Sequence, residues 1–96
     1  MNSYKPYKLK NIKEKNLANS FLKLKTEQDV ANYLRDILTI KELEEFANRL
    51  EMARLLVKGW SYKKIAREMK ISTTTVTRTA HWLRHGCGGY GIVLSE

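Results

Sequence analysis

The sequence of 96 residues holds one cysteine and one proline, and each scarcity excludes a class of protein. Cys87 has no second cysteine to pair with, which excludes the disulfide scaffold of a small secreted domain. One proline and five glycines exclude collagen-like and Pro/Gly low-complexity chains. No apolar run approaches the roughly 20 residues of a membrane-spanning helix, and residues 1–15 are too polar for a signal peptide. We therefore expect one small domain in the cytoplasm.

Acidic residues are scarce in the second half of the chain. Lys and Arg number 18 against 10 Asp and Glu, a formal net charge of +8. Residues 1–48 carry a net charge of +2 and residues 49–96 carry +6, counted from the sequence. Within 58–85, Glu68 is the one acidic side chain among seven basic ones. Concentrated positive charge predicts a polyanionic partner, although a solvated basic face without a partner remains the alternative.

Hydrophobic periodicity predicts an all-α fold with five to six helices. No run of four or more residues alternates cleanly between apolar and polar, so we expect no strands. Side chains that favour the N-cap of a helix precede the apolar stripes, namely Thr26, Thr39, Ser61 and Ser72. Thr39 with Glu42 forms a capping box, and Gly59 and Gly86 are placed to end helices.

The same pattern divides the chain into three segments. Residues 1–12 form a basic N-terminal arm, and residues 13–85 form the helical domain. Residues 86–96 form a tail with four glycines in its first six positions, for which we expect irregular structure.

Residues 61–85 have the pattern of a helix–turn–helix, with two short helices joined near Lys70. Ile65 and Ala66 are expected to face inward, Met69 and Ile71 to fill the turn, and Val76 to anchor the second helix. The turn of this motif usually carries glycine where this chain has a lysine, so a positive φ at that position would cost free energy. An ordinary αα-hairpin has a similar apolar pattern, so the exposed residues must distinguish the two.

The exposed side of the second helix is rich in threonine and has basic neighbours, which favours binding to duplex DNA. Counted at 100° per residue from Val76, its far side carries Thr74, Arg78, His81 and His85. Small hydroxyl side chains at the start of a recognition helix can reach base edges, and nearby cations can bind phosphates. The predicted DNA-binding residues are Tyr62, Lys63, Lys64, Arg67, Ser72, Thr73, Thr74, Thr77 and Arg78.

The threonine run 73–79 also weakens its own helix. Threonine and valine form helices less readily than alanine by roughly 0.5 kcal/mol each, so stability alone would not select this run. Departures of this kind from local rules are typical of functional sites.

From Leu38 onward the chain resembles the Trp-repressor family, and within it the YerC/YecD-type branch of Trp-repressor-related proteins. The matching stretches are LTIKELEEFANR (38–49), LLVKGWSYKKIAREM (55–69) and STTTVTRTAHWL (72–83). The resemblance implies an intertwined all-α homodimer and a repressor that binds a two-fold-symmetric operator. The apolar residues of the first two helices also favour a dimer, because they form more apolar surface than a monomer of this length can bury. A dimer would place two recognition helices about 34 Å apart along the DNA.

The resemblance also implies a ligand pocket, because free tryptophan binds beside the recognition helix of the Trp repressor. The corresponding positions here are Thr39, Arg49, Thr75, Arg78, Thr79 and Trp82. By this resemblance Arg49 would hold the carboxylate of the amino acid, and Arg78 would stack on its ring. The family has small residues at positions 79 and 82. We therefore hypothesise that the Trp82 indole, a group of roughly 200 Å², fills the cleft and that DNA binding needs no cofactor. A place for Trp82 in the dimer core is the alternative.

Two other functions remain open. The surface 61–85 would also suit a basic helical adaptor for an acidic protein or RNA. His81, His85 and Cys87 would suit a metal- or thiol-responsive regulator, but no fourth ligand is near them and the local charge is positive, so we expect no metal. We expect no enzyme, because this Cys–His pair lacks an orienting third group, and the chain has no phosphate-binding loop or dinucleotide fingerprint.

Overall fold

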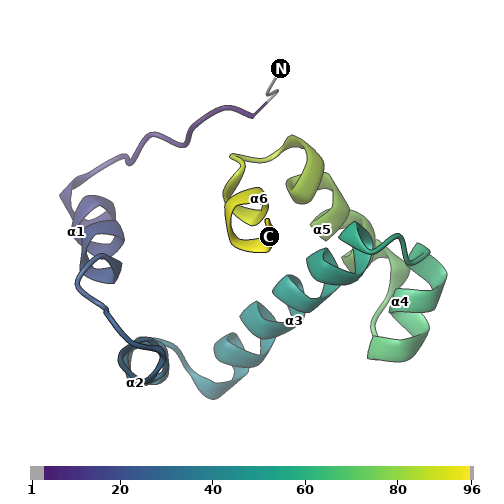
Figure 1. The fold of residues 1–96 in the computed structure, drawn as a ribbon, viewed down its shortest axis with the longest axis horizontal. Coiled ribbons are helices and arrows are strands. Elements are labelled where there is room, and N and C mark those ends of the chain that lie inside the picture. Colours follow the sequence, from purple (N-terminus) through teal and green to yellow (C-terminus); the bar gives the residue numbers. More distant parts are fainter. Residues whose placement is uncertain (1–3, 96) are drawn as a thin grey trace. The chain divides into compact units, whose positions relative to one another are not determined.

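The computed structural model describes residues 4–95, which fold into six helices and no strand (Figure 1). The helices are α1 Ile12–Phe21, α2 Glu27–Ile37, α3 Ile40–Val57, α4 Tyr62–Met69, α5 Thr73–His85 and α6 Gly89–Leu94. The all-α fold predicted from the periodicity is thus confirmed. Within the described part of the chain, no helix is both long and apolar enough to cross a membrane.

The chain forms two compact units, and α3 runs from one into the other. One unit comprises residues 7–45, and the other comprises residues 46–95 together with residues 4–6. The helix–turn–helix lies entirely in the second unit.

Helices α1 and α2 are held together by a small contact near Tyr33. Its ring meets Phe21 edge-on with centroids 5.2 Å apart, and its hydroxyl forms a hydrogen bond of 2.6 Å with the hydroxyl of Ser20. Neither helix buries a side chain in this chain. The free energy that these two helices gain from burial within their own unit is therefore small.

The predicted helix caps form. Thr39 Oγ1 accepts a hydrogen bond from the Glu42 amide at 3.1 Å, and the Glu42 carboxylate accepts one from the Thr39 amide at 2.9 Å. This capping box starts α3, and the donated hydrogen bonds hold the pKa of Glu42 below its usual value, the backbone amide of Thr39 contributing most. Thr26, Ser61 and Ser72 each accept a hydrogen bond from the third residue after them.

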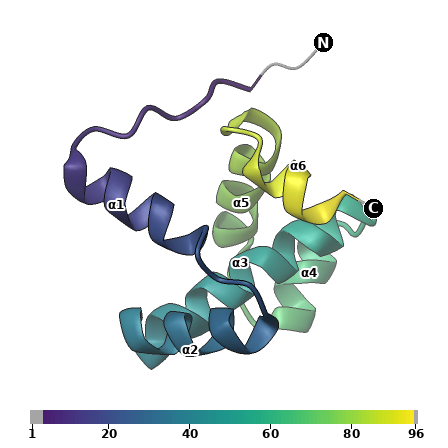
Figure 2. The same cartoon turned by 60° about the vertical axis from the view of Figure 1, so that its left-hand side comes forward.

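The core of the second unit joins α3, α4 and α5 (Figure 2). Ile65 of α4 and Val76 of α5 are fully buried, as the sequence predicted. From α3 the buried residues are Met52, Ala53, Leu55 and Leu56. Not all apolar residues of α3 lie in this core, because Met52 and Leu55 are buried whereas Phe46 and Leu50 are exposed.

The turn between α4 and α5 has the geometry that usually requires glycine. Lys70 ends α4 with φ 57° and ψ 47°, in the left-handed region, and its amide donates to the carbonyl of Ala66. Met69 and Ile71 on either side pack against the core. The expected helix–turn–helix geometry is kept despite the lysine, and the half-buried Met69 and Ile71 on either side help to fix the path of the backbone.

The tail differs from the sequence-based expectation of irregular structure. Gly88, with φ 87°, turns the chain, and the next six residues form α6. Gly88 also lies against the Tyr4 ring, where an added Cβ would come within 3.2 Å of a ring carbon. The Tyr4 hydroxyl donates to the carbonyl of Leu83 at 3.1 Å. Glycine-rich composition predicted a loop, but Tyr90 and Leu94 are half-buried and favour a short helix over an open chain.

Candidate nucleic-acid interface

Helix α5 begins at an exposed end of the helix–turn–helix. Ser72 caps it, because its Oγ accepts from the Thr75 amide at 3.1 Å and lies 2.9 Å from Thr75 Oγ1. The buried face of α5 consists of Val76, Thr79 and Ala80. The opposite side of its first turns is therefore open to solvent.

The threonines predicted to touch DNA are exposed. Thr73, Thr74 and Thr77 all lie in solvent, at the start of α5. The Thr77 hydroxyl donates to the Thr73 carbonyl at 2.9 Å. Thr79, by contrast, is buried, and its hydroxyl lies 3.7 Å from the sulfur of Met52, to which it donates. The threonine run thus supplies both the outer surface of α5 and part of its buried face.

Helix α4, which precedes α5, carries exposed basic side chains. Lys63, Lys64 and Arg67 are exposed, and the Lys64 ammonium lies 4.0 Å from the centroid of the Trp60 ring. Such a cation–π contact restrains the lysine without neutralising its charge. Arg67 has Glu68 beside it at 4.0 Å, where solvent screens the pair. These cations remain available to phosphate groups.

Two further residues connect α4 to the end of α5. Arg84 donates to the Tyr62 hydroxyl at 2.6 Å. Tyr62 was predicted as a DNA-binding residue, and its hydroxyl is also engaged in this bond. Arg84 was not in the predicted set, although its position on the helical wheel, close to that of Thr73, would have indicated it.

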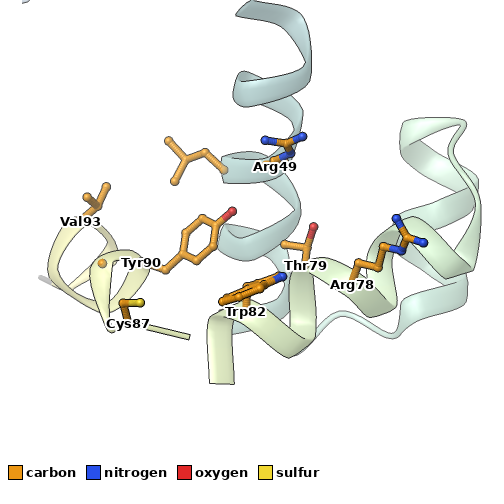
Figure 3. Close-up of a pocket in the computed structure, with 9 residues that line it drawn as sticks. Arg49, Arg78, Thr79, Trp82, Cys87, Tyr90 and Val93 are labelled. Atoms are coloured by element: carbon orange, nitrogen blue, oxygen red, sulfur yellow. The ribbon is translucent and has the colours of Figure 1, made fainter. Parts of the chain in front are cut away.

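A hollow of about 870 Å³ lies between α3, α5 and α6 (Figure 3). In the close-up, Trp82 and Thr79 lie between Tyr90 on one side and Arg78 on the other. The residues that line it are Arg49, Leu50, Arg78, Thr79, Trp82, Cys87, Gly89, Tyr90 and Val93. Its wall is largely apolar, with two arginines at its edges.

Four of the six residues expected at a ligand pocket line this hollow: Arg49, Arg78, Thr79 and Trp82. Thr75 is exposed and bonded to Ser72, and Thr39 caps α3 in the other unit. The Trp82 side chain is 59% exposed, so in the single chain its indole lines the hollow rather than filling it. Cys87, Tyr90 and Val93 were missed because the sequence predicted no helix after Gly86.

The histidines and the cysteine do not form a metal-binding group. His81 and His85 have ring centroids 5.4 Å apart, and the His81 ring meets Trp82 edge-on. Among residues 4–95, no three His, Cys, Asp or Glu side chains gather in the way that a metal ion would require. Cys87 is an exposed thiol.

The fold and this surface define a helix–turn–helix protein of the kind whose second helix enters a DNA groove. The family model described as Trp repressor protein matches residues 13–96, so the chain belongs to the Trp repressor family. It is 38% identical over 80 residues to the uncharacterised protein YerC of Bacillus subtilis (strain 168), covering 83% of this chain and 77% of YerC. The crystal structure of a TrpR-like protein from Eubacterium eligens ATCC 27750 matches with a TM-score of 0.81 and 30% identity, over 88% of both chains. The family expected from residues 38–83 is confirmed.

Proposed function

We propose that the chain is a homodimeric transcriptional repressor that reads a palindromic operator in double-stranded DNA through α5. The observation that carries this proposal is the exposure of Thr73, Thr74 and Thr77 at the end of a helix whose opposite face is fixed to the core. A recognition helix needs this arrangement, because its first residues must reach base edges while its other side stays anchored.

Phosphate contacts would come from the exposed cations of α4. Lys63, Lys64 and Arg67 lie within one turn of each other on the helix that precedes the recognition helix. Such contacts supply affinity without reading sequence, and they make binding fall steeply with salt. Arg78, exposed on α5, is proposed as a further contact.

The dimer is supported by apolar surface that the single chain leaves uncovered. Helices α1 and α2 bury no side chain, yet they carry large apolar residues. Leu17, Phe21, Val30 and Ile37 are all exposed. A second copy would cover such faces and would supply the second recognition helix that a palindrome requires.

We further propose that DNA binding needs no tryptophan. Buried Thr79 and the Trp82 indole occupy positions where the family has small residues, which changes the shape of the hollow that a free amino acid would enter. Calorimetric titration with L-tryptophan tests this directly: no heat of binding is expected, and micromolar affinity would refute it. Trp82→Ser removes the indole from the wall of the hollow, and we expect this variant to bind tryptophan.

Selection of bound sequences from a random duplex pool tests the main proposal. We expect one palindrome to be enriched, with half-sites one helical turn apart, and light scattering should give the mass of a dimer. No enriched sequence, with capture of RNA or an acidic protein instead, would contradict it and favour the adaptor function.

A charge-matched pair of variants tests the binding of phosphates by α4. The triple variant Lys63→Ala/Lys64→Ala/Arg67→Ala should reduce the slope of log K against log salt by about 0.9 for each phosphate that the variant no longer neutralises. The control Lys13→Ala/Lys15→Ala/Lys23→Ala removes the same charge outside the helix–turn–helix. It should leave that slope nearly unchanged, and equal slopes in the two variants would refute the placement on α4.

A further inference from the structure

The hydroxyl groups along residues 72–79 are not equally available to a partner. Ser72 and Thr75 bond to each other at the start of α5, with the Thr75 amide also donating to Ser72. Thr79 donates to the buried sulfur of Met52. These three hydroxyl groups serve the helix and its core.

Thr77 is exposed, but its hydroxyl is also engaged within the helix. Its Oγ1 donates to the carbonyl of Thr73 one turn earlier, at 2.9 Å. The hydroxyl and the methyl group lie about 120° apart around the Cα–Cβ bond, so the methyl group cannot also face that carbonyl. The hydroxyl has thus used its one proton within the helix, and the methyl group is the part of Thr77 that offers a partner an apolar contact.

Thr73 and Thr74 differ from Thr77 in this respect. Both are exposed, and within the described residues neither hydroxyl forms a hydrogen bond. On an ideal helix Thr77 lies between them in angle, about 40° from Thr73 and about 60° from Thr74. It stands roughly 4.5 Å beyond Thr74 and roughly 6 Å beyond Thr73 along the helix axis. The surface therefore presents two hydroxyl groups at its tip and one methyl group a turn behind them.

We propose that Thr77 determines specificity through its methyl group, by packing against the 5-methyl group of a thymine in each half-site. Thr73 and Thr74 supply the hydrogen-bonding contacts. The major groove exposes the thymine methyl group, and apolar contact with it is one of the ways in which proteins distinguish A·T from other pairs. This inference rests on the proposed function, because it specifies what α5 reads in the DNA.

Two substitutions at position 77 separate the methyl group from the hydroxyl group. Thr77→Val keeps a methyl group in place and loses the hydroxyl, whereas Thr77→Ser keeps the hydroxyl and loses the methyl. We expect Thr77→Val to bind the enriched duplex within about twofold of wild type. Thr77→Ser should lose about fourfold per half-site, the equivalent of one methyl group withdrawn from an apolar contact, hence about fifteenfold for two half-sites. The matched pair at Thr74 should show the opposite order, with Thr74→Ser retained and Thr74→Val weakened.

The probe is the duplex that the wild-type chain enriches from a random pool, compared with copies in which single thymines are replaced by deoxyuridine. Deoxyuridine lacks only the 5-methyl group. One thymine per half-site should be sensitive to this change in wild type and in Thr77→Val, and insensitive in Thr77→Ser.

An enriched duplex that tolerates deoxyuridine at every position, or equal losses in the two Thr77 variants, overturns this inference alone. Failure of wild type to enrich any duplex overturns the proposed function as well. Equal thermal stability of the variants, measured by circular dichroism, excludes a folding effect.

Discussion

Lys70 provides the sharpest test of the turn that positions α5. Among the residues that the structure describes, Lys70 is the one residue other than glycine that has a positive φ. A left-handed backbone with a Cβ atom costs roughly 1–2 kcal/mol, and glycine escapes this cost. Glycine also adds conformational freedom to the unfolded chain, which offsets about 0.4–1 kcal/mol of this gain in stability. Lys70→Gly should therefore raise the free energy of unfolding by about 0.5–1 kcal/mol.

The assay is thermal unfolding followed by far-ultraviolet circular dichroism, at one salt and one protein concentration. For a domain of this size a change of 1 kcal/mol moves Tm by about 4–8 °C, so we expect a rise of about 2–8 °C. Lys70→Ala is the control, because it removes the same charge and keeps the Cβ atom. If Lys70→Gly and Lys70→Ala unfold at the same temperature, the backbone of the turn carries no strain and the reasoning is refuted.

Three other predictions follow from the core, the end of α5 and the start of α3. Ile65→Ala should lower the free energy of unfolding by about 2–5 kcal/mol in urea titration, because Ile65 is fully buried; a loss below 1 kcal/mol would contradict its place in the core. Gly86→Ala should lower Tm, because the new Cβ would lie 2.4 Å from the Trp82 carbonyl oxygen, and an unchanged Tm would contradict this geometry. The hydrogen bonds from Thr39 lower the pKa of Glu42 in the folded chain. The carboxylate therefore contributes to the free energy of unfolding above pH 4.5, its ordinary pKa, and this contribution is lost as the pH falls below that value. The protection of the Thr39 amide from hydrogen exchange, taken relative to its intrinsic rate at each pH, should therefore fall in acid, and Glu42→Gln should remove that dependence on pH.

The helix starts and the core of the helix–turn–helix could be predicted from the sequence, because their signals are local. The capping side chains of Thr39, Ser61 and Ser72 act within three residues of their own position, so their spacing alone predicts the helix starts. The buried positions of α4 and α5 were also predictable, because Ile65 and Val76 belong to a motif with a fixed spacing.

Tertiary packing determines which side chains of α3 are buried and which residues line the hollow. The hydrophobic periodicity of the sequence carries no information about that packing. Helix α3 has apolar residues on more than one face, and its contacts with α4 and α5 determine that Met52 is buried and Leu50 is exposed. The walls contributed by Tyr90 and Val93 could not be predicted, because α6 forms in a segment whose glycines disfavour helix.

Helices α1 and α2 keep all their apolar side chains accessible, and this determines how the N-terminal half of the chain acquires its structure. Isolated helices of this length are marginal in water, and burial within the chain does little to stabilise them. In the dimer proposed above, the second copy would supply most of the free energy that orders these two helices. Folding and assembly of this half of the molecule would then be one event, and its ordered fraction would rise with protein concentration.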